Sequence, residues 1–391
     1  MSFLRAARAA LAGQSSPYII LSVIAVVLSG FFISCGSSSH SSSSPNHSAY
    51  VTLPASGSVA LLHINGATGA ISMGAQTPQT EGTSPKGLAL LPSKKFLYVA
   101  NSRANTISIF NVGSDGSLTL SGTPTPAGQS PDAAVIDPSG KYLLVTNNLS
   151  NLSLSGDISV FSIDASSGAL SQVGSTTPAN NDPSEILITP SGKFVYVTNP
   201  GQGTVTGFTF SNGLLSAVPN SPIFSGLGAI GLAVDSSGRF LYVANAAAPN
   251  PSVPSQGNIS GFNIDPNTGA LTPILGSPFT SSNGSGPSAL TVDPSGRFVY
   301  ATTSGSSYSI WCFAITPTNG QLTPVTSSPF SLAAGGLFAL IDPSGNYLYV
   351  GSSTGNGVAG FTYNPSTGVP TAILNSPFST GTAPGKMVIS E

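Results

Sequence analysis

Four charged residues, each one or two positions after a proline, have the side chains that ester hydrolysis requires. They are Lys86, Asp132, Glu185 and Lys386. A carboxylate such as Glu185 or Asp132 can take a proton from water, and an ammonium group such as Lys86 can stabilise a developing oxyanion. Lys386 and Arg103 add positive charge that could bind a ligand. These residues form a site only if the fold brings them together.

A repeated turn shows which elements would position these residues. A four-residue segment recurs at intervals of about 50 residues, and three of its six copies read Asp-Pro-Ser-Gly. Proline at the second position and glycine at the fourth favour a type I turn, and aspartate caps its own backbone. The six copies are Leu91-Pro92-Ser93-Lys94, Asp137-Pro138-Ser139-Gly140, Thr189-Pro190-Ser191-Gly192, Asp235-Ser236-Ser237-Gly238, Asp293-Pro294-Ser295-Gly296 and Asp342-Pro343-Ser344-Gly345. Each turn is expected to join two antiparallel strands.

The residues around each turn predict four strands per repeat. Short aromatic and β-branched runs such as Phe96-Leu97-Tyr98-Val99 follow the turn, and no segment has helical periodicity. A third strand such as Ile259 to Ile264 leads through the turn Asp265 to Gly269 into a fourth strand beginning near Leu271. Four antiparallel strands form one blade of a β-propeller.

The two ends of the repeat region complete each other. Tyr50 to Gly74 supplies strands two to four of a blade, and Pro384 to Glu391 supplies only the innermost strand. Joining them closes the ring and removes exposed sheet edges. The sequence therefore predicts an all-β fold, a seven-bladed β-propeller over residues 50–391 whose C-terminal strand joins three N-terminal strands.

Two further motifs resemble a known family. Tyr196-Val197-Thr198-Asn199 matches the tetrapeptide of YVTN propeller repeats, and the pattern from Asp293 to Tyr300 resembles the lactonase family of seven-bladed propellers. That family includes 6-phosphogluconolactonases and muconate cycloisomerases. The resemblance covers Tyr50 to Glu391 and implies the propeller fold, with lactone hydrolysis as an activity to test.

In a propeller the four charged residues would start the innermost strands of neighbouring blades, at the top face where ligands generally bind. The remaining blades carry Ile230-Gly231, Ser288-Ala289 and Leu337-Phe338 at the corresponding positions. We therefore expect a channel mouth that is charged on one side and apolar on the other. It could be a binding or catalytic site, or only a set of ion pairs at the rim.

Other features narrow the possible functions. His63, the one histidine between residues 50 and 391, falls at a third-strand position away from the channel, although related enzymes place histidine in the central pocket. The sequence has no Cys/His cluster, no calcium loop and no dinucleotide-binding strand–turn–helix, so neither metal nor cofactor is expected. Charged residues make up only 6% and the basic ones do not cluster, which argues against nucleic-acid binding.

The N-terminal segment predicts export. Arg5 and Arg8 precede an apolar run, and Phe32-Ile33-Ser34-Cys35 resembles a lipobox in which Cys35 is lipidated; an uncleaved membrane anchor is the alternative. Residues 36–49 are expected to form a Ser-rich flexible tether. The only other cysteine, Cys312, is expected to be a buried, inert thiol rather than half of a disulfide.

Taken together, these features favour a monomeric cell-envelope propeller that binds a glycan, a small molecule or an envelope protein through its top face. Long top-face loops at Asn147 to Gly156 and Asn245 to Gly257 could contribute to binding. The alternatives are a lactone hydrolase using Glu185 or Asp132 with Lys86, and a non-enzymatic assembly scaffold.

Overall fold

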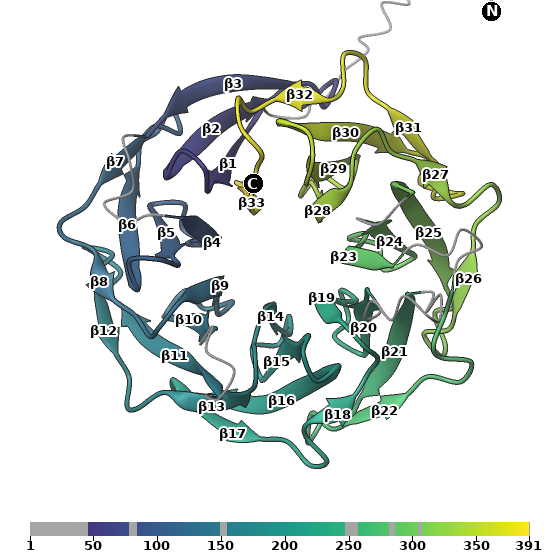
Figure 1. The fold of residues 1–391 in the computed structure, drawn as a ribbon, viewed down its shortest axis with the longest axis horizontal. Coiled ribbons are helices and arrows are strands. Elements are labelled where there is room, and N and C mark those ends of the chain that lie inside the picture. Colours follow the sequence, from purple (N-terminus) through teal and green to yellow (C-terminus); the bar gives the residue numbers. More distant parts are fainter. Residues whose placement is uncertain are drawn as a thin grey trace, which may run out of the picture. The chain divides into compact units, whose positions relative to one another are not determined.

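The computed structural model describes residues 46–77, 84–148, 155–246, 257–280, 286–303 and 307–390. They belong to one compact unit, Ser44–Glu391, whose described part contains strands and no helix. Seven sheets are arranged in a ring around a central channel (Figure 1). The predicted seven-bladed β-propeller is therefore confirmed.

The two inner strands of each blade come from the two sides of the repeated turn. Blades are numbered from the one that contains the N-terminal strands. In blade order 1 to 7, the innermost strands are β33 (Met387–Ile389), β4 (Pro85–Leu90), β9 (Pro131–Ile136), β14 (Ile186–Ile188), β19 (Ala229–Val234), β23 (Pro287–Val292) and β28 (Gly336–Ile341). The second strands are β1 (His47–Leu53), β5 (Phe96–Asn101), β10 (Tyr142–Asn147), β15 (Phe194–Asn199), β20 (Phe240–Asn245), β24 (Phe298–Thr303) and β29 (Tyr347–Ser352).

The outer half of each blade contains the predicted third and fourth strands. The third strands are β2 (Ser58–Ile64), β6 (Thr106–Val112), β11 (Gly156–Ile163), β16 (Thr204–Ser211), β21 (Asn258–Ile264), β25 (Ser309–Ile315) and β30 (Gly357–Tyr363). The fourth strands are β3 (Ile71–Gln76), β7 (Leu118–Leu120), β12 (Leu170–Gln172), β17 (Leu214–Ala217), β22 (Leu271–Pro273), β26 (Leu322–Pro324) and β31 (Pro370–Ala372).

Five blades carry a short additional strand that was not predicted. It follows the fourth strand and pairs with the top end of the third strand of the same blade. These strands are β8 (Thr125–Pro126), β13 (Thr177–Asn180), β18 (Ile223–Phe224), β27 (Phe330–Ser331) and β32 (Phe378–Ser379). From this outer strand the chain crosses the top face to the innermost strand of the next blade (Figure 1).

The ring closes as the sequence predicted. In blade 1 the strand order is β3-β2-β1-β33, and Ala49, Tyr50 and Val51 of β1 pair with residues 387–389 of β33. Strand β1 begins at His47, three residues before the expected start of the domain, so the fold includes a second, buried histidine. The rest of the expected tether, residues 36–45, and Cys35 lie outside the described residues.

Hydrophobic packing holds neighbouring blades together. The seven hydrophobic clusters each combine side chains from two adjacent blades, for example Trp311 of blade 6 with Tyr242 of blade 5. At six of the seven joints a buried tyrosine of the second strand also donates a hydrogen bond to a glycine carbonyl of the next blade, as Tyr98 does to Gly168 at 3.0 Å. Leu144 takes the tyrosine position at the remaining joint, between blades 3 and 4.

In the described part of the chain no helix is long and apolar enough to cross a membrane. Cys312 is buried and unpaired there, as expected. Burial raises the pKa of its thiol to about 12.

Candidate functional site

A β-bulge at the top of the innermost strands positions the side chains of the channel mouth. In blade 5, Ala229 pairs with Asn245 and Gly231 with Ala244, so Ile230 is an extra residue without a cross-strand partner. Ser288 and Leu337 are the corresponding extra residues in blades 6 and 7. A bulge redirects a side chain out of the regular alternation of a strand. The repeated bulge therefore places one residue of each such blade at the channel mouth, and this residue has no cross-strand partner.

The charged blades use the same step. Registers in β4 and β9 shift around Lys86 and Asp132. In blades 4 and 1, Glu185 and Lys386 lie one residue further along, immediately before β14 and β33. The structure thus brings together all four residues that the sequence singled out at the starts of the innermost strands.

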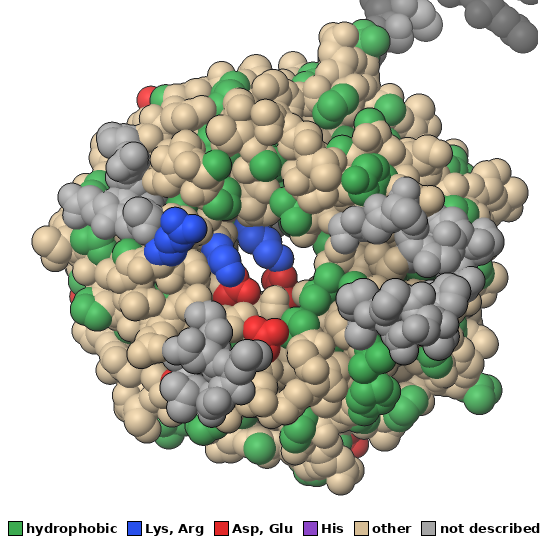
Figure 2. Space-filling model, viewed as in Figure 1, with side chains coloured by type: hydrophobic (Ala, Val, Ile, Leu, Met, Phe, Trp, Pro, Cys, Tyr) green, Lys and Arg blue, Asp and Glu red, His purple; other side chains and the backbone are tan. Residues whose placement is uncertain are grey.

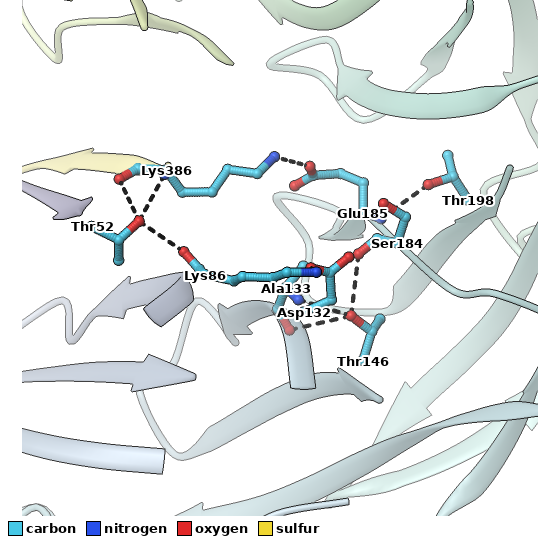
Figure 3. A network of polar contacts seen from close by, with 9 residues as sticks. All are labelled: Thr52, Lys86, Asp132, Ala133, Thr146, Ser184, Glu185, Thr198 and Lys386. Atoms are coloured by element: carbon cyan, nitrogen blue, oxygen red, sulfur yellow. Dashed lines mark hydrogen bonds and ion pairs between the residues drawn. The ribbon is translucent and has the colours of Figure 1, made fainter. Parts of the chain in front are cut away.

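Threonine hydroxyls of the second strands brace these bulges. The backbone N–H of Glu185 donates to Thr198 Oγ1 at 3.0 Å, and the N–H of Lys386 donates to Thr52 Oγ1 at 2.9 Å. Thr146 accepts from Ala133 at 3.0 Å in the same way, and its hydroxyl donates to the Ser184 carbonyl of the next blade at 3.2 Å (Figure 3). The threonine of the Tyr-Val-Thr-Asn motif, Thr198, is therefore a positioning residue, a role that the sequence analysis missed.

Two ion pairs join the charged side chains (Figure 3). Lys86 Nζ lies 2.7 Å from Asp132 Oδ1, between the adjacent blades 2 and 3. Lys386 Nζ pairs with Glu185 Oε2, which joins blade 1 to blade 4 across the channel. The carboxylates are the less exposed partners, with 18% of the Asp132 side chain and 26% of the Glu185 side chain accessible.

The environment of Lys386 keeps it charged. Burial by itself would lower the pKa of Lys386, but the charge of Glu185, the hydrogen bond to it and the more distant charge of Asp132 together raise that pKa. Both carboxylates therefore act on one ammonium group. This coupling makes the four side chains a single electrostatic unit.

The Lys386–Glu185 pair lines two cavities of the channel. An outer pocket of about 150 Å³ is open to the top face and is lined by all four charged residues together with Leu337. An inner cavity of about 160 Å³ is lined by Glu185 and Lys386 and also by Ser288, Phe338 and Met387. The ion pair therefore borders both spaces.

The predicted asymmetry of the mouth is present. Figure 2 shows the basic and acidic side chains gathered at one side of the channel, with hydrophobic side chains at the other. Leu337 and Ile230 are both partly exposed at the bulge positions of the second side, and Ser288 lies in the blade between them. The Ser288 hydroxyl donates to the carbonyl of Gly336 at 2.6 Å, which ties blade 6 to blade 7.

The remaining predicted site residues do not enter the outer pocket. Arg103 is exposed in the loop between β5 and β6, on the top face but outside the pocket lining. His63 lies exposed on β2 and pairs with Ser72 of β3, away from the channel as expected. Most of the two long loops, residues 149–154 and 247–256, lie outside the described residues.

A larger cavity of about 420 Å³ lies between blades 6 and 7. Its lining includes Leu332, Phe361 and Phe378 and contains no titratable side chain. It therefore supplies no acid, base or charged ligand-binding group. Within the described ranges no three His, Cys, Asp or Glu side chains are grouped to hold a metal ion.

The chemistry available at the outer pocket is that of two ammonium groups and two carboxylates. Each ammonium group has three N–H donors and each carboxylate has several acceptor positions, so the two ion pairs leave hydrogen-bonding capacity for a ligand. A carboxylate beside an ammonium group also matches the base and oxyanion-stabilising roles of ester hydrolysis. No histidine takes part in the described site.

Comparison with known proteins places this geometry in a family. The family model described as "Lactonase, 7-bladed beta-propeller" matches residues 39–181, 154–278 and 255–383. No curated protein matches the chain.

Several solved structures share the fold. A protein of Bacteroides uniformis, provisionally named a 6-phosphogluconolactonase, has a TM-score of 0.74 at 19% identity, covering 88% of this chain and 99% of its own. The periplasmic gluconolactonase of Pseudomonas aeruginosa has a TM-score of 0.73 at 18% identity, covering 89% and 99%. Hydrazine synthase of Kuenenia stuttgartiensis also matches, with a TM-score of 0.59, 15% identity, and 83% and 95% coverage.

A fold shared by such different proteins does not by itself define an activity. The family model, however, matches nearly the whole propeller. The chain therefore belongs to the seven-bladed β-propeller lactonase family.

Proposed function

We propose that this protein binds a small, uncharged, polyhydroxylated ligand in the outer pocket, such as a sugar or a sugar-derived lactone. The observation that carries the proposal is the pair of ion pairs lining that pocket, Lys86–Asp132 and Lys386–Glu185. Hydroxyl groups both donate and accept hydrogen bonds, so they fit a pocket that presents ammonium and carboxylate groups side by side.

Charge balance and size support this ligand class. The two lysines and two acids lining the pocket have opposite charges that sum to zero, whereas a phosphorylated ligand needs an excess of positive charge. Arg103 also lies on the top face, but it does not line the pocket. A volume of about 150 Å³ is smaller than that of drug-sized sites and suits a monosaccharide-sized molecule.

Hydrolysis of a lactone at the same site is the second candidate, and membership of the lactonase family favours it. Glu185 or Asp132 would take a proton from water, whose oxygen attacks the lactone carbonyl carbon. The ring C–O bond then breaks and the leaving oxygen takes up a proton, while Lys86 stabilises the oxyanion. Both carboxylates already pair with lysines, however, so a role as base would require one of these ion pairs to open, which favours binding over turnover.

The first test is a thermal-shift screen of the unit Ser44–Glu391 with neutral monosaccharides and lactones, because this unit contains all seven complete sheets. A pH-stat assay on the lactones would run beside it with wild type, Glu185→Gln and, as a matched control on the opposite face, Asp115→Asn. A shift without turnover supports binding. Turnover lost in Glu185→Gln but kept in Asp115→Asn would instead establish a hydrolase, and no shift in the whole panel would favour a scaffold.

We further propose that the protein is exported and anchored through Cys35. The apolar segment and the Phe32-Ile33-Ser34-Cys35 tetrapeptide support this. Incorporation of labelled palmitate by the full chain that disappears in Cys35→Ala is the expected result. Equal labelling of both chains, or none in either, would contradict it.

A further inference from the structure

Four apolar side chains lie on the uncharged side of the top face, between the outer pocket and the rim, and are here called the apolar strip. It consists of Leu337, Ile230, Leu227 and Phe224, of which Leu337, Leu227 and Phe224 are 40%, 50% and 62% exposed. Leu337 lines the outer pocket itself, beside the charged side chains. Ile230 has the equivalent bulge position in blade 5. The strip therefore begins inside the proposed binding pocket.

The outer part of the strip follows one crossing of the chain over the top face. This crossing runs from β18 at the rim to β19 beside the channel (Figure 1). Phe224, Leu227 and Ile230 recur along it at every third residue, whereas Ser225 and Ala229 between them are buried. The crossing thus presents three large apolar side chains to solvent in order from rim to centre.

Two of the equivalent crossings on the charged side carry no such side chains. Residues 127–130, which lead from β8 to β9, read Ala-Gly-Gln-Ser, and residues 181–184, which precede β14, read Asn-Asp-Pro-Ser. Both crossings have the same place in the fold as the one from β18 to β19. Among these three crossings, only the one from β18 to β19 presents large apolar side chains to solvent.

Isolated exposed leucines are ordinary on a protein surface and carry no argument by themselves. Leu275 and Leu374 are each 83% exposed, and neither lines a pocket of the charged channel. The strip differs because it continues a polar pocket into an apolar surface. Such continuity suits one ligand with two chemically different ends.

The lining of the pocket indicates which direction suits an apolar end. The Lys386–Glu185 ion pair lines both the outer pocket and the inner cavity, so a tail directed toward the inner cavity would lie against two charged groups. Leu337, the large aliphatic side chain in the lining of the outer pocket, lies on the uncharged side of the mouth. An apolar tail is therefore favoured past Leu337, on the top face.

From these observations we propose that the ligand is amphiphilic, with a hydroxylated or lactone head in the outer pocket and a short alkyl or acyl tail on the apolar strip. This inference rests on the proposed function and adds the tail to it. Burial of about two methylene groups of such a tail would strengthen binding about tenfold.

The test compares probes that differ only in their tails. Hexyl and methyl β-glycosides of glucose, galactose and mannose would be titrated calorimetrically into the unit Ser44–Glu391, below the micelle concentration of the hexyl compounds. We expect at least one hexyl glycoside to bind about tenfold more tightly than its methyl partner. In Leu227→Ser, which changes a strip residue outside the pocket lining, this advantage should fall while methyl glycoside binding stays unchanged.

Leu374→Ser is the matched control, because it removes an equally large but more exposed leucine outside the strip. Leu337→Ser, at the pocket wall, provides a second variant within the strip and should also reduce the hexyl advantage. Equal affinities of methyl and hexyl glycosides would overturn the amphiphilic ligand and leave the proposed sugar site intact. A hexyl advantage that falls equally in Leu337→Ser and Leu374→Ser would show non-specific adsorption and also overturn it. If no probe binds at all, the proposed function fails together with this inference.

Discussion

The two halves of the channel mouth are built on the same backbone and differ in what they present to a ligand. Asp132 in blade 3 and Leu337 in blade 7 occupy the same bulge step, one in an ion pair and the other as an exposed apolar side chain. The comparison teaches that the repeat supplies equivalent positions around the channel, and that individual substitutions at those positions give the site its chemistry.

The residue of the second strand that faces the bulge also differs between blades. Thr52, Thr146 and Thr198 brace the bulges in blades 1, 3 and 4. In blades 5 and 7 the same position is Ala244 or Gly351, neither of which has a hydroxyl group, and in blade 6 it is Thr302, whose hydroxyl group makes no hydrogen bond to a bulge. A threonine brace therefore accompanies three of the four blades that carry charge.

The largest effect is expected from removing the strand that completes the charged half. A chain ending at Pro384 loses β33, and with it Lys386, buried Met387 and the pairing with β1. Loss of Met387 alone should lower the free energy of unfolding by about 2–5 kcal/mol. Urea unfolding measures this, with Lys386→Met as the variant that keeps the strand. A truncated chain as stable as wild type would contradict the closure of the ring.

Alkaline pH should act on the joints of both halves alike. Burial, followed by nearby aspartates, raises the pKa of Tyr50 to about 12 and also raises the pKa of Tyr98 and of its counterparts at the other joints. Above pH 10 the unfolded chain ionises its tyrosines before the folded chain does. Stability should then fall by up to about 1.4 kcal/mol per pH unit for each such tyrosine.

The check for this prediction is urea unfolding between pH 9 and pH 11, with Tyr98→Phe beside wild type. That variant should show a shallower loss of stability with rising pH. The stability that Lys386 contributes should also be lost at alkaline pH. The pKa of Lys386 is raised in the folded chain, so its stabilisation is present at lower pH and is lost as pH rises through that pKa. A wild-type stability that does not change above pH 10 would contradict these assignments.

Breaking the cross-channel pair should have a smaller effect. Lys386→Met leaves Glu185 without its partner and should cost about 1 kcal/mol, reduced from the buried-pair value because both side chains are partly exposed. The double variant with Glu185→Gln should cost less than the sum of the two single variants. Additive losses in a double-mutant cycle would show that the pair contributes no coupling energy.

The smallest effect on stability is expected in the apolar half. Leu337 is 40% exposed, so Leu337→Ser should change the free energy of unfolding by no more than about 0.5 kcal/mol. Thermal unfolding beside Asp132→Asn measures this. A large loss in Leu337→Ser would mean that the apolar half is structural packing rather than a ligand surface.

Much of the fold could be predicted because each repeat encodes its own turn and strands. The Asp-Pro-Ser-Gly turn, the aromatic run after it and the two incomplete ends were sufficient to predict seven closed blades. The short outer strands such as β8 and β32 could not be predicted, because two residues carry no periodic signal and their pairing depends on the neighbouring third strand.

The site was predicted as a set of residues but not as an arrangement. Their common position after a proline indicated that Lys86, Asp132, Glu185 and Lys386 meet at the mouth. That Lys386 pairs with Glu185 rather than with Asp132 depends on the width of the channel and on the one-residue offset of both residues from the bulge step. Such details follow from three-dimensional register and could not be read from repeat spacing.

The most direct test of the central claim is calorimetric titration of the strongest ligand from the screen into wild type and into the double variant Lys86→Met, Asp132→Asn. This variant keeps the volume of the pocket wall and removes one complete ion pair. We predict a loss of affinity of about tenfold or more, since several polar contacts disappear together. Unchanged affinity in the double variant would contradict a ligand site in the charged half of the channel mouth.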